Sequence, residues 1–278
     1  MNILDRIKSQ SAKLTDTDRK IIDTLFDNRT ETAFLSGPQL AARAKVHEAT
    51  ATRLAQKLGY KGYPEMRAQL QREVLDGQDA ANRMRRSVSK VEHGDYLADL
   101  IAMEVAALEG LARCVSQAEI DQAADLLFDA RQVFIFGQGH ALSVASFLQR
   151  RLDRFGMTTV ALTGRGRDIA ERLVSMTPDD AVITLAFRKQ PESYAPLIRH
   201  AASVGARSIL VSDLAGPMME PRADLMLAAP RGRSDSEFQT PTVPFAIIDA
   251  ILLTIAGRHE HKVIGKLEKL SGLFDSFD

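Results

Sequence analysis

Between residues 39 and 58, polar side chains that are able to contact a nucleic acid share a segment with small apolar ones. The spacing of the apolar residues predicts two short helices joined by a tight turn. Their packed side is predicted to consist of Leu40, Ala41, Val46, Ala51, Leu54, Ala55 and Leu58. The outer side of the second helix is then predicted to present Glu48, Thr50, Arg53, Gln56 and Lys57 to solvent.

This spacing is that of a helix-turn-helix, in which the second helix enters the major groove of DNA. The Arg53 guanidinium is suited to guanine or phosphate, and the Thr50 side chain to phosphate or a thymine methyl group. His47 in the turn and Lys61 beyond the helix complete the candidate DNA-binding set. The spacing alone leaves a second possibility open, a three-helix bundle whose polar face meets only water.

Charge is unevenly distributed along the chain, although its formal net charge is zero. Residues 1–90 contain 17 Lys and Arg against 11 Asp and Glu, whereas the remaining residues contain 19 against 25. A basic first third joined to an acidic remainder favours contact with a polyanion through the N-terminal part alone.

A second candidate site lies between residues 133 and 143, where an apolar run is followed by glycines and a helix pattern. Backbone N–H groups at such a helix start attract anions. The residues predicted to bind a ligand here are Gly137, Gln138, Gly139, His140 and Ser143. A dinucleotide-binding fingerprint is not supported, because Leu142 occupies the place of its third glycine and no acidic residue closes the second strand.

The elements that position these residues fall into two classes along the chain. Residues 1–77 show only helical patterns, and Thr15 with Asp18 predicts a capped helix start. Residues 78–112 combine a charged linker, Arg83 to Lys90, with a connecting helix. From residue 113, apolar runs alternate with amphipathic segments, which predicts an α/β domain with a parallel, doubly wound sheet. The five predicted strands are Val133–Phe136, Val160–Leu162, Ala181–Ala186, Ser208–Val211 and Asp224–Ala228.

The all-α N-terminal domain, residues 1–77, resembles that of RpiR-type bacterial transcription regulators. The resemblance rests on Leu14-Thr-Asp-Thr-Asp-Arg-Lys-Ile, Gln39-Leu-Ala, Glu48-Ala-Thr, Arg53 and Lys57-Leu-Gly-Tyr-Lys-Gly-Tyr, the last of which is a specific family signature. It implies a DNA-binding helix-turn-helix domain. Two residues of the turn depart from the family pattern, because Lys45 replaces a glycine and His47 replaces a serine N-cap. Each departure is expected to cost about 1 kcal/mol of stability.

Residues 113–278 resemble the sugar isomerase (SIS) domain, the usual effector domain of RpiR-type proteins. The resemblance implies a five-stranded parallel sheet with helices on both faces and phosphosugar ligands at the carboxyl ends of the strands. It places ligand-binding segments at residues 137–143, 186–193 and 234–239. In the last two segments, the residues expected to bind the ligand are Phe187, Arg188, Lys189, Ser234, Ser236 and Glu237.

Most of the phosphate-binding hydroxyl groups of the SIS family are absent from this chain. Ala141 stands where the family has a serine, and Ala186-Phe-Arg-Lys-Gln-Pro191 replaces Ser-x-Ser-Gly-x-Thr. The Phe-Arg-Lys pattern is similar to the Phe-Arg-Arg of one subgroup of RpiR-type regulators. Arg188 and Lys189 supply cations in place of the hydroxyls, so we expect a small anionic metabolite, either sugar-like or sugar-acid-like.

The sequence therefore predicts a cytoplasmic transcription regulator that binds double-stranded operator DNA as a homodimer or higher homo-oligomer. The ligand is expected to shift the two DNA-binding heads through the linker around residues 82–95. No membrane, metal, cofactor or enzyme activity is expected. Two alternatives stay open. One is a SIS-type sugar-phosphate isomerase with Glu192, Glu237 or His140 as its base, and the other is a constitutive DNA-binding protein that uses the SIS domain only to oligomerise.

Overall fold

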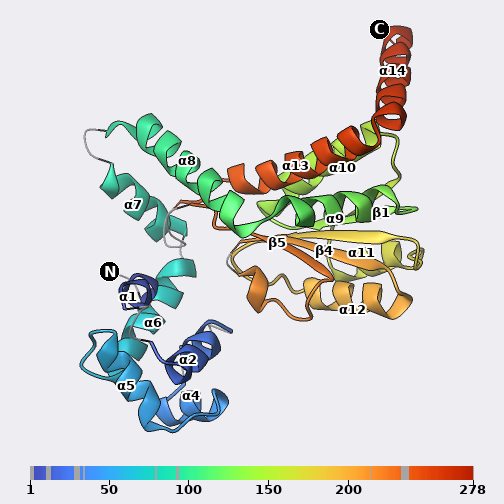
Figure 1. Ribbon diagram of the computed structural model, residues 1–278. Coiled ribbons are helices and arrows are strands. Elements are labelled where there is room, and N and C mark those ends of the chain that lie inside the picture. The colour runs from blue at the N-terminus through green and yellow to red at the C-terminus, as the bar shows by residue number, and fades with distance from the viewer. Residues whose placement is uncertain are drawn as a thin grey trace. The chain divides into compact units, whose positions relative to one another are not determined.

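The computed structural model describes residues 3–10, 14–27, 32–33, 35–78, 80–91, 94–213, 215–232 and 238–277. The chain divides into two compact units. The first is formed by residues 1–94 with 236–238, and the second by the remainder. Figure 1 shows the helices and strands of both units.

The described part of the first unit is helical. Its helices are α1 (Ile3–Ser9), α2 (Asp16–Asp27), α4 (Gly37–Arg43), α5 (Ala49–Lys57), α6 (Tyr63–Gln78) and α7 (Ala80–Lys90) (Figure 1). The buried apolar side chains of the helices from α1 to α6 form one core, to which Ile21, Leu25 and Met66 belong. Helix α7 covers the charged stretch that the sequence suggested as a linker. No glycine or proline interrupts residues 80–90, so the backbone completes its helical hydrogen bonds there.

The helix-turn-helix lies in α4, the turn at residues 44–48, and α5, as predicted. The predicted packed side is confirmed, because these residues are buried in the core or packed against it: Leu40, Ala41, Val46, Ala51, Leu54, Ala55 and Leu58. Apolar side chains repeated at helical spacing thus hold the two helices together.

Lys45 follows α4 in a left-handed conformation, with a φ of 54°. The Val46 and Lys45 N–H groups donate to the carbonyls of Ala41 and Ala42 at 2.9 and 3.1 Å, which is the hydrogen-bond pattern of a Schellman C-cap. The same pattern ends α5, where Gly59, with a φ of 82°, takes the corresponding position. Lys45 thus takes a left-handed conformation at the place where the family pattern has glycine, and its Cβ carries the steric strain that glycine avoids.

Lys45→Gly is expected to stabilise the first unit by about 0.5–1 kcal/mol, because glycine adopts a positive φ without strain. The matched variant Gly59→Ala places a Cβ 3.0 Å from the Arg6 guanidinium at a φ of 82° and should destabilise the unit by about 1 kcal/mol. Hydrogen exchange in the whole chain, measured at the amides of α4 and α5, reports both changes. Unchanged or faster exchange in Lys45→Gly would show that the lysine side chain stabilises the turn by contacts of its own.

The second unit contains a five-stranded parallel sheet in its described residues. The strands are β1 (Val133–Gly137), β2 (Thr159–Leu162), β3 (Ala181–Ala186), β4 (Arg207–Ser212) and β5 (Leu225–Ala228). Their order is β2-β1-β3-β4-β5, and each neighbouring pair is parallel. In the central pair, Val133 lies beside Ala181 and Gly137 beside Leu185. Each predicted strand is confirmed to within one residue at its ends.

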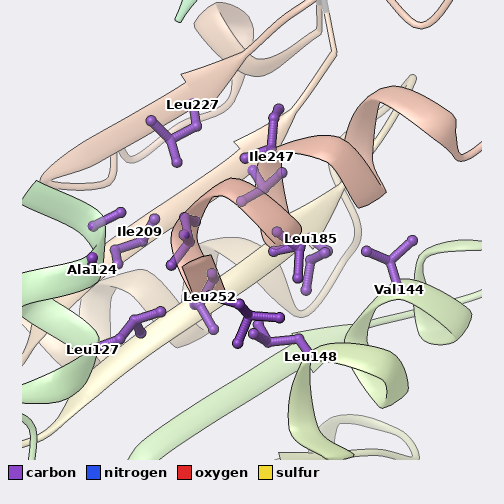
Figure 2. Close-up of a cluster of buried hydrophobic side chains, with 14 of the residues drawn as sticks. Ala124, Leu127, Val144, Leu148, Leu185, Ile209, Leu227, Ile247 and Leu252 are labelled. Carbon is purple, nitrogen blue, oxygen red and sulfur yellow. The ribbon is translucent and has the colours of Figure 1, made fainter. Parts of the chain in front are cut away.

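Helices cover both faces of this sheet. The helices of the unit are α8 (Tyr96–Cys114), α9 (Gln117–Phe128), α10 (Ala141–Arg154), α11 (Gly166–Leu173), α12 (Tyr194–Val204), α13 (Thr242–Arg258) and α14 (Glu260–Phe277), with a short 3-10 helix η3 (Gly216–Met218). On one face, side chains of α9, α10 and α13 meet those of the strands. Figure 2 shows Leu127, Leu148 and Leu252 from these helices in the same apolar cluster as Ile209 of β4. On the other face, helices α11 and α12 pack on the opposite side chains of β1 and β3.

Within the described ranges, no single helix is long and apolar enough to cross a membrane. The strongly bent pair of α13 and α14 reaches the length and apolar composition of a membrane span only when its two helices are taken together. The side chains of α13 belong largely to the core of the second unit, where Ile247, Ile251 and Ile255 are at most 1% exposed.

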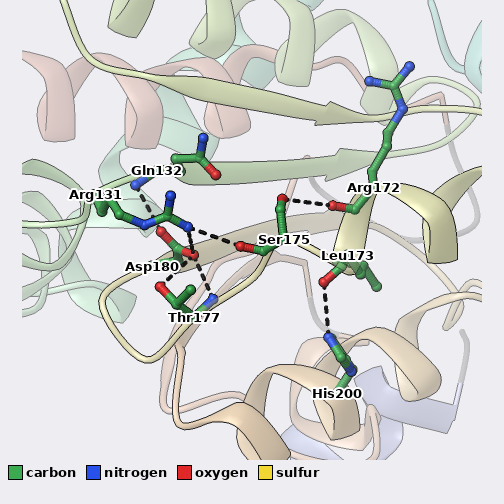
Figure 3. A network of polar contacts seen from close by, with 8 residues as sticks. All are labelled: Arg131, Gln132, Arg172, Leu173, Ser175, Thr177, Asp180 and His200. Atoms are coloured by element: carbon green, nitrogen blue, oxygen red, sulfur yellow. Dashed lines mark hydrogen bonds and ion pairs between the residues drawn. The ribbon is translucent and has the colours of Figure 1, made fainter.

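The buried carboxylate of Asp180 joins the loops at the amino ends of the strands (Figure 3). Its Oδ2 accepts hydrogen bonds from Arg131 Nη2 and from the Thr177 N–H, both at 2.7 Å, and its Oδ1 accepts from the Gln132 N–H at 3.1 Å. Arg131 also donates to the Ser175 carbonyl at 3.0 Å. These charge-assisted hydrogen bonds hold the starts of β1 and β3 together.

Candidate functional site

Helix α5 presents a continuous stripe of exposed residues. The stripe consists of Ala49, Thr52, Arg53 and Gln56. Successive members are three, one and three residues apart, which places them on one side of the helix. Arg53 Nη2 donates to the Thr50 hydroxyl at 3.3 Å, and this contact orients the guanidinium. Arg53 and Gln56 are thus exposed as the sequence predicted.

The prediction that Thr50 faces solvent is wrong. Thr50 is 3% exposed and lies with Ala51, Leu54 and Leu58 on the packed side of α5, because these spacings return to the same helix face. Thr52 takes the exposed place instead. Thr52 was not predicted from the sequence, although its spacing from the other exposed residues of the helix was a usable signal.

His47 replaces the expected serine cap with a ring nitrogen. The Ala49 N–H donates to Nδ1 of His47 at 3.3 Å, and the Thr50 N–H donates to the His47 carbonyl at 2.9 Å. The turn therefore keeps an acceptor for an N–H group of the first helical turn, so we infer a smaller loss of capping than the sequence suggested. The His47 and Glu48 side chains are exposed where α5 begins.

The carboxyl end of α5 is fixed by Arg6 of α1. Arg6 Nη1 donates to the carbonyls of Leu58 and Gly59 at 3.0 and 3.2 Å, and the guanidinium lies 4.4 Å from the centre of the Tyr60 ring. A cation at the last carbonyls of a helix complements its dipole. Lys61, just beyond this anchor, is exposed.

Lys57, another predicted DNA contact, forms an ion pair within the protein. Its Nζ lies 2.5 Å from Oδ2 of Asp18, whose side chain is 3% exposed. The N–H and hydroxyl groups of Thr15 donate to the same oxygen at 2.9 and 2.8 Å, which confirms the predicted cap of α2. Burial by itself raises the pKa of Asp18, but Lys57 and the Thr15 hydrogen bonds together hold this pKa below its usual value of 3.8.

Acidification is expected to destabilise the first unit through Asp18. Because its pKa is lower in the folded than in the unfolded chain, its stabilisation is complete above about pH 4 and is lost as the pH falls through the lowered pKa. Asp18→Asn removes this pH-dependent part and should lower the free energy of unfolding by about 1–2 kcal/mol at neutral pH. Urea unfolding of both proteins between pH 3 and 7, followed by circular dichroism, measures the difference. A constant difference across this range would contradict the expectation.

The predicted ligand segments follow β1, β3 and β5 in the chain. With the order β2-β1-β3-β4-β5, the connections from β1 and β3 diverge, and α/β proteins of this order bind ligands in the crevice beyond the carboxyl ends of these strands. Gly137 lies at that end of β1, where a Cβ would come within 2.9 Å of the Ala141 carbonyl oxygen. Only glycine therefore allows α10 to start so close to the strand.

The other predicted ligand residues of the first segment are exposed. Gln138 Nε2 donates to the Gly164 carbonyl at 3.3 Å, and the Ser143 hydroxyl donates to the His140 carbonyl at 2.9 Å. The His140 ring makes no capping hydrogen bond to α10, and Gly139 has a φ of 57° with open space around it. The structure brings these residues together at the start of α10, and their contact with a ligand stays a prediction.

Residues 187–189 form a tight turn at the end of β3. The Lys189 N–H donates to the Phe187 carbonyl at 2.9 Å, and the intervening Arg188 has a φ of 71°. These are features of the positive-φ γ-turn, which is rare and strained. Strained backbone is concentrated at ligand-binding and catalytic sites, so this turn supports the choice of the segment. Lys189 is exposed and Phe187 is half-buried.

Two charged residues that the sequence analysis missed complete this edge of the sheet. Asp213 is 2% exposed and follows β4, the strand between β3 and β5. Its carboxylate accepts hydrogen bonds from the Arg188 N–H at 3.0 Å and from Arg231 Nε and Nη2 at 3.0 and 2.7 Å. Arg231 follows β5, is 7% exposed, and lies with its guanidinium 4.7 Å from the centre of the Phe187 ring. A signal was available, because both charges come two or three residues after a predicted strand.

Ser234, Ser236 and Glu237 lie outside the described residues, and their contact with a ligand stays a prediction. In the described part of the chain, no group of three or more His, Cys, Asp or Glu residues is placed to hold a metal ion. An open depression of about 570 Å³ lies at the amino ends of the strands, beside Asp129 and Pro178. It is therefore at the opposite edge of the sheet from the predicted ligand segments.

Comparison with known proteins assigns both units. Residues 1–76 match the helix-turn-helix domain of the rpiR family, and residues 126–256 match the SIS domain. The HTH-type transcriptional regulator HexR of Pseudomonas aeruginosa is 25% identical over 232 residues, which cover 82% of this chain and 79% of that protein. HexR of Escherichia coli is 26% identical over 160 residues, 58% of this chain and 55% of that protein.

Solved structures show the same fold. The sugar isomerase domain of an RpiR transcription factor from Sphaerobacter thermophilus has a TM-score of 0.56 at 22% identity, over 60% of this chain and 93% of that one. The Vibrio vulnificus NanR protein complexed with ManNAc-6P has a TM-score of 0.56 at 16% identity, over 100% of this chain and 99% of that one. With an rpiR-family helix-turn-helix domain followed by a SIS domain, and with HTH-type regulators as its relatives, the chain belongs to the RpiR-type transcription regulators.

Proposed function

We propose that this regulator binds a palindromic operator as a homodimer and responds to a small anionic metabolite, sugar-like or sugar-acid-like, bound by its SIS domain. The observation that carries the DNA-binding part is the exposed Thr52, Arg53 and Gln56 stripe on a helix that is fixed at both ends. A rigid helix with exposed polar side chains is what reading base edges in the major groove requires. Because operator DNA lies in the bacterial cytoplasm, we expect the regulator to act there.

The anionic ligand is supported by the cationic turn after β3. Arg188 and Lys189 lie beside the crevice expected at the carboxyl ends of β1 and β3, and the backbone of this turn is strained. The start of α10 after the neighbouring strand adds the positive end of a helix dipole. The NanR structure contains a phosphosugar, which makes sugar phosphates reasonable first probes.

The homodimer is supported by an apolar stripe on α8. Leu97, Ile101 and Val105 are 68%, 54% and 50% exposed at four-residue spacing, so they share one side of the helix. Leu108 continues the stripe. An apolar surface of this kind on one helix face marks an interface, and a second copy of the chain is the partner that a palindromic operator requires.

Isomerase activity is the weaker candidate for this SIS domain. An isomerase needs a general base that is positioned against the sugar. The candidate bases His140 and Glu192 are exposed, and Glu237 lies outside the described residues. The curated relatives that cover most of the chain are named as transcription regulators, which favours a sensing role for the domain.

Fluorescence anisotropy of the whole protein with DNA fragments from around its own gene tests the proposal. We expect saturable binding to one fragment with a steep decrease in affinity as salt rises, since phosphate contacts release counterions. Repeating the titration with sugar phosphates and sugar acids should reveal a ligand that changes the affinity. Equal affinity for every fragment would contradict operator recognition, and equal affinity with and without every probe would contradict metabolite sensing.

A further inference from the structure

The guanidinium of Arg231 is buried and held in a fixed orientation at the carboxyl end of the sheet. Asp213 binds its Nε and Nη2 at 3.0 and 2.7 Å, Gln239 accepts from Nη2 at 2.8 Å, and the Phe187 ring lies 4.7 Å away. The residue is only 7% exposed. A planar cation fixed by a carboxylate on one edge and an aromatic ring on its face is preorganised, so binding a ligand costs little further ordering.

One nitrogen of this guanidinium has no hydrogen-bond partner among the described residues. Arg231 Nη1 makes no hydrogen bond to any residue in the described ranges. By contrast, Nε donates to Asp213, and Nη2 donates to Asp213 and Gln239. Nη1 is not one of the fully buried atoms without a partner, so it keeps access to solvent and an anionic oxygen can reach it. Arginine is the side chain best suited to carboxylate and phosphate oxygens.

The position of Arg231 connects this nitrogen to the predicted ligand segments. Asp213, to which it is bound, also holds the N–H of Arg188 in the strained turn after β3. Gln239, its other acceptor, lies in the segment that leads into α13. Arg231 therefore joins the loops after β3, β4 and β5, which is where a ligand of this fold is bound.

We propose that Arg231 is the residue that binds the anionic group, carboxylate or phosphate, of the effector, with Asp213 and Phe187 as its positioning residues. The proposal rests on the effector site described under the proposed function. It replaces the missing serine hydroxyls with one oriented guanidinium. Arg188 and Lys189, which are less enclosed, then add attraction to the ligand without fixing its geometry.

Isothermal titration of the whole protein tests this assignment with four probes: inorganic phosphate, N-acetylmannosamine 6-phosphate, glucose 6-phosphate and gluconate. We expect the wild-type protein to bind at least one of the three sugar compounds, and Arg231→Lys to bind it at least 10-fold more weakly, because an ammonium cannot keep both the Asp213 contacts and the ligand. A response to gluconate alone identifies a carboxylate, and a response to the phosphorylated probes identifies a phosphate. The matched control is Arg207→Lys at the amino end of β4, which should bind like the wild type.

A second variant guards against a loss of folding. The double change Asp213→Asn and Arg231→Gln removes both charges, so no unpaired buried charge destabilises the site. We expect this variant to keep the wild-type circular dichroism spectrum and to lose the ligand. Wild-type affinity in Arg231→Lys or in the double variant would overturn the assignment, as would a wild-type protein that binds none of the probes. Operator binding by the wild-type protein is measured separately, so a failure here is distinguishable from a failure of the regulator function.

Discussion

Arg53→Ala is expected to reduce the affinity for the operator by about 1–3 kcal/mol, roughly 5- to 150-fold, with a much smaller effect on non-specific DNA. Arg53 is exposed on the stripe of α5, and its contact with the Thr50 hydroxyl orients it. A guanidinium in that position is suited to two acceptors on a guanine edge. Removing it therefore affects recognition more than general attraction to DNA.

Anisotropy titrations with the operator and with a scrambled duplex at several salt concentrations measure both effects of Arg53→Ala. Arg172→Ala is the matched control, because Arg172 is an exposed arginine on α11 of the SIS domain and should leave both affinities unchanged. Equal losses on the operator and on the scrambled duplex would show that Arg53 binds phosphate only. In that case base recognition would depend on Thr52 and Gln56.

Asp213→Ala is expected to destabilise the second unit by about 3–5 kcal/mol, because it leaves the guanidinium of Arg231 buried without its counter-charge. Asp213 is 2% exposed, and its carboxylate joins the loops after β3 and β5 by direct hydrogen bonds. The change also removes the acceptor that holds the strained backbone of Arg188.

Hydrogen exchange of the whole chain, measured at the amides of β3, β4 and β5, gives the loss of stability in Asp213→Ala without assuming that the two units unfold together. The control is Glu220→Gln. Its carboxylate is 71% exposed, lies 3.8 Å from Arg222, and should change stability by less than about 0.5 kcal/mol. A loss of less than about 1 kcal/mol in Asp213→Ala would mean that Arg231 turns to water and is not held in the buried position.

The fold could be predicted closely from the sequence, because strands of a parallel sheet are buried on both faces and appear as continuous apolar runs. β3 and β1 are buried at every residue, and their bounds were predicted to within one residue. The left-handed residue at position 45 was expected from the family resemblance, in which a glycine takes this place. Apolar runs and turn chemistry are properties of neighbours in the chain.

The candidate site was less predictable, because its key contacts join residues that are distant in the sequence. The Asp213 and Arg231 pair spans 18 residues, and the Lys57 and Asp18 pair spans 39. No local pattern identifies such partners, so the ion pair of Lys57 with Asp18 was not predicted. Lys57 is exposed as the sequence indicated, and its contact with DNA stays a prediction. The error at Thr50 has a different cause. A helix of 3.6 residues per turn places Thr50 on the same face as Leu54, but the prediction followed the polar hydroxyl group and not this spacing.

Because synthesis runs from the N-terminus, the first unit, which consists mainly of residues 1–94, is made before the second. The DNA-binding head has its own core and leaves the ribosome first, while the residues that follow need roughly 10–40 s of further synthesis. Helix α8, with the apolar stripe proposed to pair two copies, belongs to the later part. An unfinished or truncated chain would therefore carry a single head and bind a palindromic operator only weakly. Occupancy of the operator would then depend on completed chains, each of which also carries a SIS domain.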